Sequence, residues 1–163
     1  MEWDGRESSG IFVGNPIGWL LRNVNSSLAL FKDNGIRGFS KVLIALRPGR
    51  KNKNFITVAD KICCHFDASL TLLNIVSASE KKHKVKRIES NSKELVSNTK
   101  CVSNIKIIES NSPVEAVSEE SAGYDLLILG TPEKDNWIRV LFGTGEDRFV
   151  KKAACSVLRL TLK

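Results

Sequence analysis

Five short apolar runs alternate with segments of helical periodicity, and this alternation constrains the fold more than any other feature. The runs are residues 41–46, 70–76, 104–109, 124–129 and 156–162. Each has the length of a buried strand and is bounded by polar, glycine or proline residues. Because parallel strands need crossover helices, the pattern predicts an α/β fold. We expect a three-layer parallel-sheet sandwich with five strands in the order βαβαβαβαβ.

Two helices are predicted from the segments that follow the first two runs. Six apolar residues recur at helical spacing and predict one continuous apolar face: Phe55, Val58, Ala59, Ile62, Cys63 and Phe66. The stretch from 80 to 100 is rich in lysine and has sparse apolar positions. It predicts a second, loosely bounded helix.

Local start signals mark two further helices. Ser112 precedes Pro113 and is followed three positions later by Glu115, a pattern that predicts a capping box and a helix to Ala122 before Gly123. Thr144 is expected to cap the last helix, which runs to about residue 154.

The chain's 163 residues suffice for one domain with a hydrophobic core and some additional structure. The longest uncharged stretch, residues 8–21, is shorter than the roughly 18 residues that a spanning helix needs, so we expect no transmembrane helix and a cytoplasmic location. The cysteines lack CxxC spacing, and His65 and His83 lie far apart. We expect reduced structural thiols and no metal site.

Residues 14–31 align without a gap on residues 143–160. In both segments a capping residue follows a glycine, a basic residue lies in the helix, and a serine precedes the strand. We therefore interpret residues 1–34 as the last helix and strand of a preceding repeat, 35–40 as a linker and 41–163 as a complete domain. The alternative is an unrelated N-terminal helix that begins at Asn15.

The chain resembles the universal stress protein family. The likeness is most specific from Ser112 to Gly130 and continues through Gly143 and Thr144 to the final strand. It implies the family's fold, which is also that of adenine nucleotide α-hydrolases, and a last strand that pairs antiparallel with its counterpart in a second domain. The implied pairing segments are residues 28–31 and 157–160, with Leu28, Ala29, Leu30, Val157, Leu158, Arg159 and Leu160 as the principal residues.

The family's nucleotide-binding loop is only partly present. Its members read Gly, two residues, Gly, nine residues, Gly and then Ser or Thr, and here Glu133 replaces the second glycine. A glutamate at that turn should repel phosphate, since it adds a side chain and a negative charge. Arg47 also stands where such members place an aspartate near the adenosine.

Binding of ATP is therefore kept as an alternative, and otherwise no cofactor is expected. In that alternative, Arg47 or Lys51 replaces the lost contacts. The remaining site residues would be Gly130, Glu133, Gly143, Thr144 and Gly145.

No motif of a catalytic site is found, since the sequence lacks G-x-S-x-G and a Walker loop. We expect a non-catalytic regulatory or dimerisation domain that self-associates, or pairs within the chain, through its last strand. Tandem domains of this family also form cytoplasmic tails of amino-acid permease and cation-chloride cotransporter type proteins. The resemblance therefore implies a transporter's membrane part as a partner.

The segment 81–87 carries five of the chain's cations, and the formal net charge is +7. Such a segment favours contact with anionic lipid headgroups. Because no aromatic residues for base stacking lie among the cations, nucleic acid is not expected as a partner.

Overall fold

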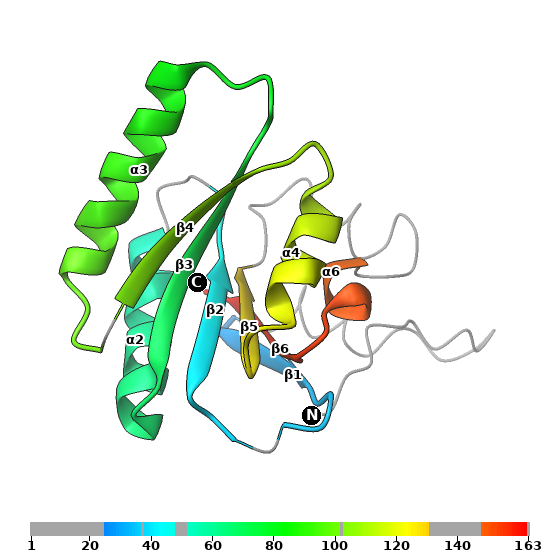
Figure 1. Ribbon diagram of the computed structural model, residues 1–163. Helices are drawn as coiled ribbons and strands as arrows, with labels where there is room; N and C mark the ends of the chain where they lie inside the picture. Colours follow the sequence, from blue (N-terminus) through cyan, green and yellow to red (C-terminus); the bar gives the residue numbers. More distant parts are fainter. Residues whose placement is uncertain (1–24, 37, 48–51, 102, 131–147, 163) are drawn as a thin grey trace.

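A six-stranded sheet forms the centre of the protein, with helices on both faces (Figure 1). The computed structural model describes residues 25–36, 38–47, 52–101, 103–130 and 148–162. The strands are β1 (Leu28–Lys32), β2 (Lys41–Ala45), β3 (Ser69–Val76), β4 (Ser103–Glu109), β5 (Leu126–Gly130) and β6 (Ser156–Thr161). The helices are α2 (Asn52–Phe66), α3 (Lys82–Ser97), α4 (Pro113–Ser121) and α6 (Arg148–Lys152).

The strands lie in the order β1-β6-β5-β2-β3-β4. Strands β2 to β6 are parallel, and of the six described strands β1 alone runs antiparallel to its neighbour. The predicted α/β architecture is thus confirmed, and the N-terminal strand joins the same sheet. The helices of the described part of the chain are each too short or too polar to cross a bilayer.

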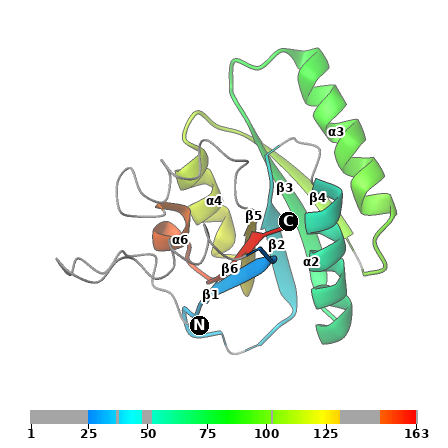
Figure 2. The same ribbon diagram turned by 180° about the vertical axis from the view of Figure 1, so that it is seen from behind.

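Helices α2 and α3 cover one face of the sheet, and α4 and α6 cover the other, as opposite views show (Figure 2). The alternation of side chains along β2 divides the core accordingly. Leu43 packs on the α4 and α6 side, whereas Val42 and Ile44 pack on the α2 side, and all three are 0% exposed. Burial of each such side chain stabilises the fold by about 1.5–3 kcal/mol.

The predicted apolar face of α2 is buried over most of its length, and Phe55, Ala59 and Cys63 lie in the core. Phe66 is the exception and the prediction was wrong there, because its side chain is 52% exposed. Its ring lies 4.4 Å from that of Phe39, centroid to centroid, at the helix end that faces the chain entering β2. The periodicity continues to Phe66, but the sheet does not cover it.

Helix α3 lies beside the edge strand β4 and is largely exposed, which agrees with its polar sequence (Figure 1). Ser92 is buried and accepts a hydrogen bond of 3.0 Å from Asn74 Nδ2 in β3. Ser92 also donates to the carbonyl of Ile88 at 2.8 Å. This polar pair joins the helix to the sheet where apolar contacts are few.

The predicted capping box of α4 was wrong, although the helix begins at Pro113 as expected. Ser112 makes no side-chain capping hydrogen bond. Glu115 forms instead an ion pair of 2.6 Å with Lys152 of α6. The tertiary partner removes the glutamate from the position that the reciprocal cap requires.

The two ends of α4 therefore give a matched test. Replacement of Ser112 by alanine should change the free energy of unfolding by less than about 0.5 kcal/mol, since no cap is lost. Ser121 is fully buried, donates to the carbonyl of Ser118 at 2.6 Å and accepts from Ala154 N–H at 2.9 Å. Ser121→Ala should cost about 1–3 kcal/mol in urea denaturation, because it leaves a buried donor unpaired. Equal losses in the free energy of unfolding for Ser112→Ala and Ser121→Ala would show that the Ser121 hydroxyl contributes no more to stability than the Ser112 hydroxyl, which makes no capping hydrogen bond.

Candidate functional site

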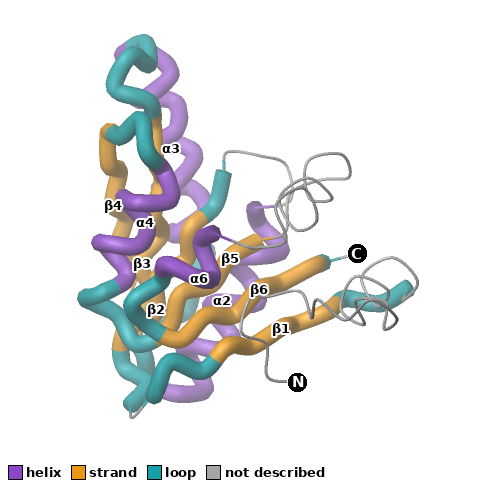
Figure 3. Tube along the Cα trace, turned by 90° about the vertical axis from the view of Figure 1, so that its right-hand side faces the viewer, coloured by secondary structure: helices purple, strands orange, loops and turns teal. Residues whose placement is uncertain are grey.

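The first candidate site is the sheet edge at which β1 lies against β6 (Figure 3). The register runs from Leu28 opposite Thr161 to Lys32 opposite Val157. The two segments expected to pair thus lie side by side within one chain. Leu30 is 6% exposed and packs in the core cluster with Val157.

A set of side-chain hydrogen bonds fastens the end of β1 to the corner between α6 and β6. Asn34 Nδ2 donates to the carbonyls of Cys155 at 2.9 Å and Ala153 at 3.2 Å. The Asn34 N–H donates to Ser156 Oγ at 2.9 Å, and Ser156 in turn donates to Asp33 Oδ1 at 3.0 Å. We call Asp33, Asn34 and Ser156 the corner clasp.

The clasp also fixes the turn that leaves β1. The N–H groups of Gly35 and Ile36 donate to Asp33 Oδ1 at 2.9 and 3.0 Å. Gly35 has φ +85°, which side chains rarely adopt, so glycine is required there. The hydrogen bonds from Ile36 N–H and the Ser156 hydroxyl lower the pKa of Asp33. The ionised Asp33 carboxylate therefore stabilises the folded state at neutral pH, and this contribution is lost as pH falls through the lowered pKa.

The second candidate site is the carboxyl edge of the sheet between β2 and β5. The chain leaves β2 toward β3 on one side, whereas β5 is followed by β6 on the other. Strand order reverses between β2 and β5, and ligands of open α/β sheets bind in the crevice at such a point. Arg47 follows β2 and is exposed, and Gly130 ends β5.

Two side chains hold Gly130 at this edge. A Cβ atom at Gly130 would lie 3.1 Å from Phe55 Cζ, so the buried ring of α2 rests directly against the glycine backbone. Arg159 Nη1 donates to the Gly130 carbonyl at 3.0 Å, and this arginine is only 5% exposed. The phenyl ring and guanidinium thus occupy space beside the strand end.

Sequence reasoning did not assign these roles to Phe55 and Arg159. Phe55 was expected only in the apolar face of its helix. For Arg159 a signal was present, since a charged residue interrupts an otherwise apolar strand, Val157 to Leu160. Such a residue is buried only when its donors find acceptors.

Several predicted nucleotide-site residues lie outside the described residues: Lys51, Glu133, Gly143, Thr144 and Gly145. The predicted helix within 1–24 and the Thr144 cap lie outside them as well. Of the predicted set, the structure places Arg47 and Gly130 at the same edge. Asn52 Nδ2 donates to the Arg47 carbonyl at 2.9 Å, which joins the start of α2 to this loop.

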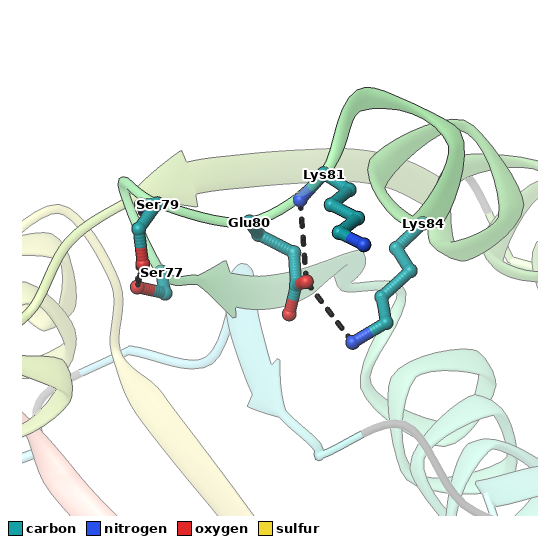
Figure 4. Close-up of polar contacts among 5 residues, drawn as sticks. All are labelled: Ser77, Ser79, Glu80, Lys81 and Lys84. Atoms are coloured by element: carbon teal, nitrogen blue, oxygen red, sulfur yellow. Dashed lines mark hydrogen bonds and ion pairs between the residues drawn. The ribbon is translucent and has the colours of Figure 1, made fainter.

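The basic segment 81–87 forms the start of α3 (Figure 4). Glu80 pairs with Lys84 at 3.1 Å and accepts from the Lys81 N–H at 3.2 Å. Lys82, Lys86 and Arg87 are exposed. The first turn of the helix contains no acidic residue, so its cations oppose the helix dipole. Contact of this segment with anionic lipid stays a prediction.

The fold of this chain, an open and mostly parallel sheet with helices between the strands, matches that of solved universal stress proteins. A universal stress protein from Archaeoglobus fulgidus has a TM-score of 0.59 at 9% identity, over 76% of this chain and 94% of that chain. Two further structures of similar fold are a universal stress protein in complex with cAMP and the universal stress protein from Archaeoglobus fulgidus in complex with dAMP. At these identities the likeness establishes the fold.

Two longer structures match a larger share of this chain. A putative universal stress protein from Pseudomonas aeruginosa has a TM-score of 0.58 at 14% identity, over 96% of this chain and 61% of that chain. The cytoplasmic domain of a prokaryotic cation chloride cotransporter has a TM-score of 0.52 at 11% identity, over 82% of this chain and 52% of that chain. No family model and no curated protein matches the sequence.

The contact between Phe55 and Gly130 predicts an unusually costly glycine substitution. Gly130→Ala should lower the free energy of unfolding by about 1–3 kcal/mol, because the added methyl overpacks the site. Gly38→Ala is the control, since nothing lies within 4 Å of a Cβ there, and it should stay within about 0.5 kcal/mol.

Combining Gly130→Ala with Phe55→Leu should cost less than the sum of the single variants, measured by chemical denaturation. The expected coupling energy is about 0.5–3 kcal/mol, because the smaller side chain makes room for the methyl group. Strict additivity would show that the ring and the glycine do not constrain one another.

Proposed function

We propose that this chain is a non-catalytic regulatory and pairing domain of universal-stress-protein type, whose working surface is the edge formed by β6. The observation that carries the proposal is the antiparallel pairing of β1 with β6. A strand edge presents a row of backbone donors and acceptors that readily pair with another chain. Here a strand from outside the βα repeat occupies that edge.

The antiparallel contacts of β1 with β6 are those expected if β1 belongs to a preceding repeat. In the universal stress protein family the last strand pairs with its counterpart in a second domain, and β1 takes the counterpart's place. The two longer structures match 96% and 82% of this chain, against 76% for the shorter Archaeoglobus protein. That increase is expected if residues before β2 have a counterpart in the longer chains.

Within this proposal, the chain forms the cytoplasmic C-terminal part of a membrane transporter. Support comes from its likeness to the cytoplasmic domain of a cation chloride cotransporter. The side chains that contact Gly130 are the apolar ring of Phe55 and the guanidinium of Arg159, which is hydrogen-bonded to the Gly130 carbonyl. These groups are suited to packing and not to catalysis. The role proposed for the domain is therefore to associate and to regulate.

Removing residues 1–34 should expose the edge of β6 and increase self-association in sedimentation velocity. The deletion removes β1 together with Asp33 and Asn34 of the corner clasp. A point variant gives a milder test: Leu30→Lys places a charge in the core and should release β1. Ala29→Lys is the control, because Ala29 is exposed on the same strand. If neither the deletion nor Leu30→Lys changes the sedimentation coefficient distribution, the edge is not the pairing surface.

A second candidate function is binding of an adenine nucleotide. It is favoured by the complexes of similar folds with cAMP and dAMP. In this chain the nucleotide would enter at the edge where Arg47 and Gly130 lie. The ring of Phe55 against Gly130 restricts that space on the α2 side.

The two functions differ in their response to ATP. A ligand present at 100 times its dissociation constant stabilises a protein by about 2.7 kcal/mol, which thermal denaturation detects readily. The pairing domain should show no ATP-specific rise in melting temperature. A rise with ATP that is absent in Arg47→Ala, while that variant melts normally without ligand, would favour nucleotide binding instead.

A further inference from the structure

A carboxylate and two thiols meet on the face of the sheet that α2 and α3 cover. Asp60 and Cys64 belong to α2, and Cys101 lies in the turn between α3 and β4. One oxygen of Asp60 and the two sulfur atoms all lie within 4.8 Å of one another. Cys64 Sγ is 3.7 Å from Asp60 Oδ1. We call these three residues the thiol cluster.

The backbone holds the thiol cluster together. Asp60 and Cys64 are separated by four positions, so they share one face of the helix. Asp60 Oδ1 accepts hydrogen bonds from the N–H groups of Lys100 at 2.8 Å and Cys101 at 3.0 Å. The carboxylate thereby fastens the turn after α3 to α2 and brings the Cys101 side chain to the helix.

The cluster is buried on one side and open to solvent on the other. Asp60 is 9% exposed and Cys101 is half-buried, whereas Cys64 is exposed to solvent. Cys63, the residue before Cys64, is fully buried in the core. An ion from solvent therefore has access at Cys64 and meets fixed donors beyond it.

A divalent ion at this position would interact favourably with each anionic donor, the Asp60 carboxylate and the two thiolates.

We propose that Asp60, Cys64 and Cys101 bind one thiophilic divalent cation, and that Zn²⁺ fits this donor set. Zinc takes sulfur at about 2.3 Å and carboxylate oxygen at about 2.0–2.2 Å in a tetrahedral arrangement. These lengths separate a sulfur and an oxygen ligand by about 3.5 Å, close to the distance between Cys64 and Asp60. Three protein ligands leave a fourth position for water.

Binding involves proton transfer to solvent but no oxidation or reduction. Each of the two thiols loses its proton to water or buffer as its sulfur bonds the metal, and Asp60 binds as the carboxylate. The ion would then link α2 to the turn between α3 and β4. Since the unfolded chain lacks this arrangement, binding stabilises the folded state.

The test uses the intact, reduced chain and Co²⁺ as a spectroscopic probe for the zinc site. We expect one Co²⁺ per chain, with a sulfur-to-cobalt charge-transfer band and the visible bands of tetrahedral cobalt, both removed by one equivalent of Zn²⁺. Zn²⁺ should also raise the melting temperature, and a chelator should reverse the rise.

Matched variants assign the ligands. Cys64→Ala and Cys101→Ala should each weaken binding at least about tenfold, as expected when a metal's coordination is disturbed. Asp60→Asn keeps an oxygen that accepts from the Lys100 and Cys101 N–H groups but loses the charge, so it should fold and bind more weakly. Cys155→Ala is the control, because Cys155 lies in the core cluster on the opposite face of the sheet.

Circular dichroism of each variant without metal establishes that it folds. Cys64 is exposed, so its replacement by alanine leaves the core unchanged and a loss of metal binding in this variant reports on the ligand alone. Cobalt binding without a sulfur-to-cobalt band, or undiminished binding by folded Cys64→Ala, would overturn the proposal. Either result would assign the bound ion to other surface groups.

Discussion

The antiparallel pairing of β1 with β6 is the interaction on which the C-terminal part of the structure depends. β6 is the last strand on its side of the parallel sheet, and without β1 its outer backbone groups would face solvent or another chain. The same segment also contacts helix α6 and the residue after it, since Lys32 Nζ donates to the Val150 carbonyl and Asn34 Nδ2 to that of Ala153. These contacts fasten the described part of α6, Arg148–Lys152, to the N-terminal segment. The N-terminal strand is therefore an integral part of this sheet.

At the carboxyl edge of the sheet, two side chains pack against the position where ligands of open α/β sheets bind. Folds of this kind bind ligands where strand order reverses, here between β2 and β5. In this chain Gly130 at that point is covered by the ring of Phe55, and its carbonyl accepts a hydrogen bond from Arg159. An apolar ring and a buried guanidinium thus both contact Gly130 at this point.

The strands and the fold class could be predicted from the sequence because buried parallel strands need continuous apolar runs, and each run became a strand. Features that depend on contacts between distant elements could not be predicted. The capping box of α4 failed because Glu115 pairs with Lys152 on another helix, and Phe66 is exposed because the sheet does not extend beneath it. The spacing of Asp60 and Cys64 on one helix face was visible, but the position of Cys101 beside them depends on how the turn after α3 packs on α2. Likewise, only the folded chain shows that Asn34 reaches Cys155.

The central claim is that β1 occupies the edge of β6 within the same chain. Isotope-filtered NMR on a mixture of labelled and unlabelled protein tests this claim directly, because it separates contacts within a chain from contacts between chains. Pairing within one chain predicts strong cross-strand contacts between Leu30 and Arg159 in the uniformly labelled sample and no such contacts in the filtered spectrum of the mixture. Cross-strand contacts in the filtered spectrum would show instead that β1 pairs with the β6 strand of a second copy.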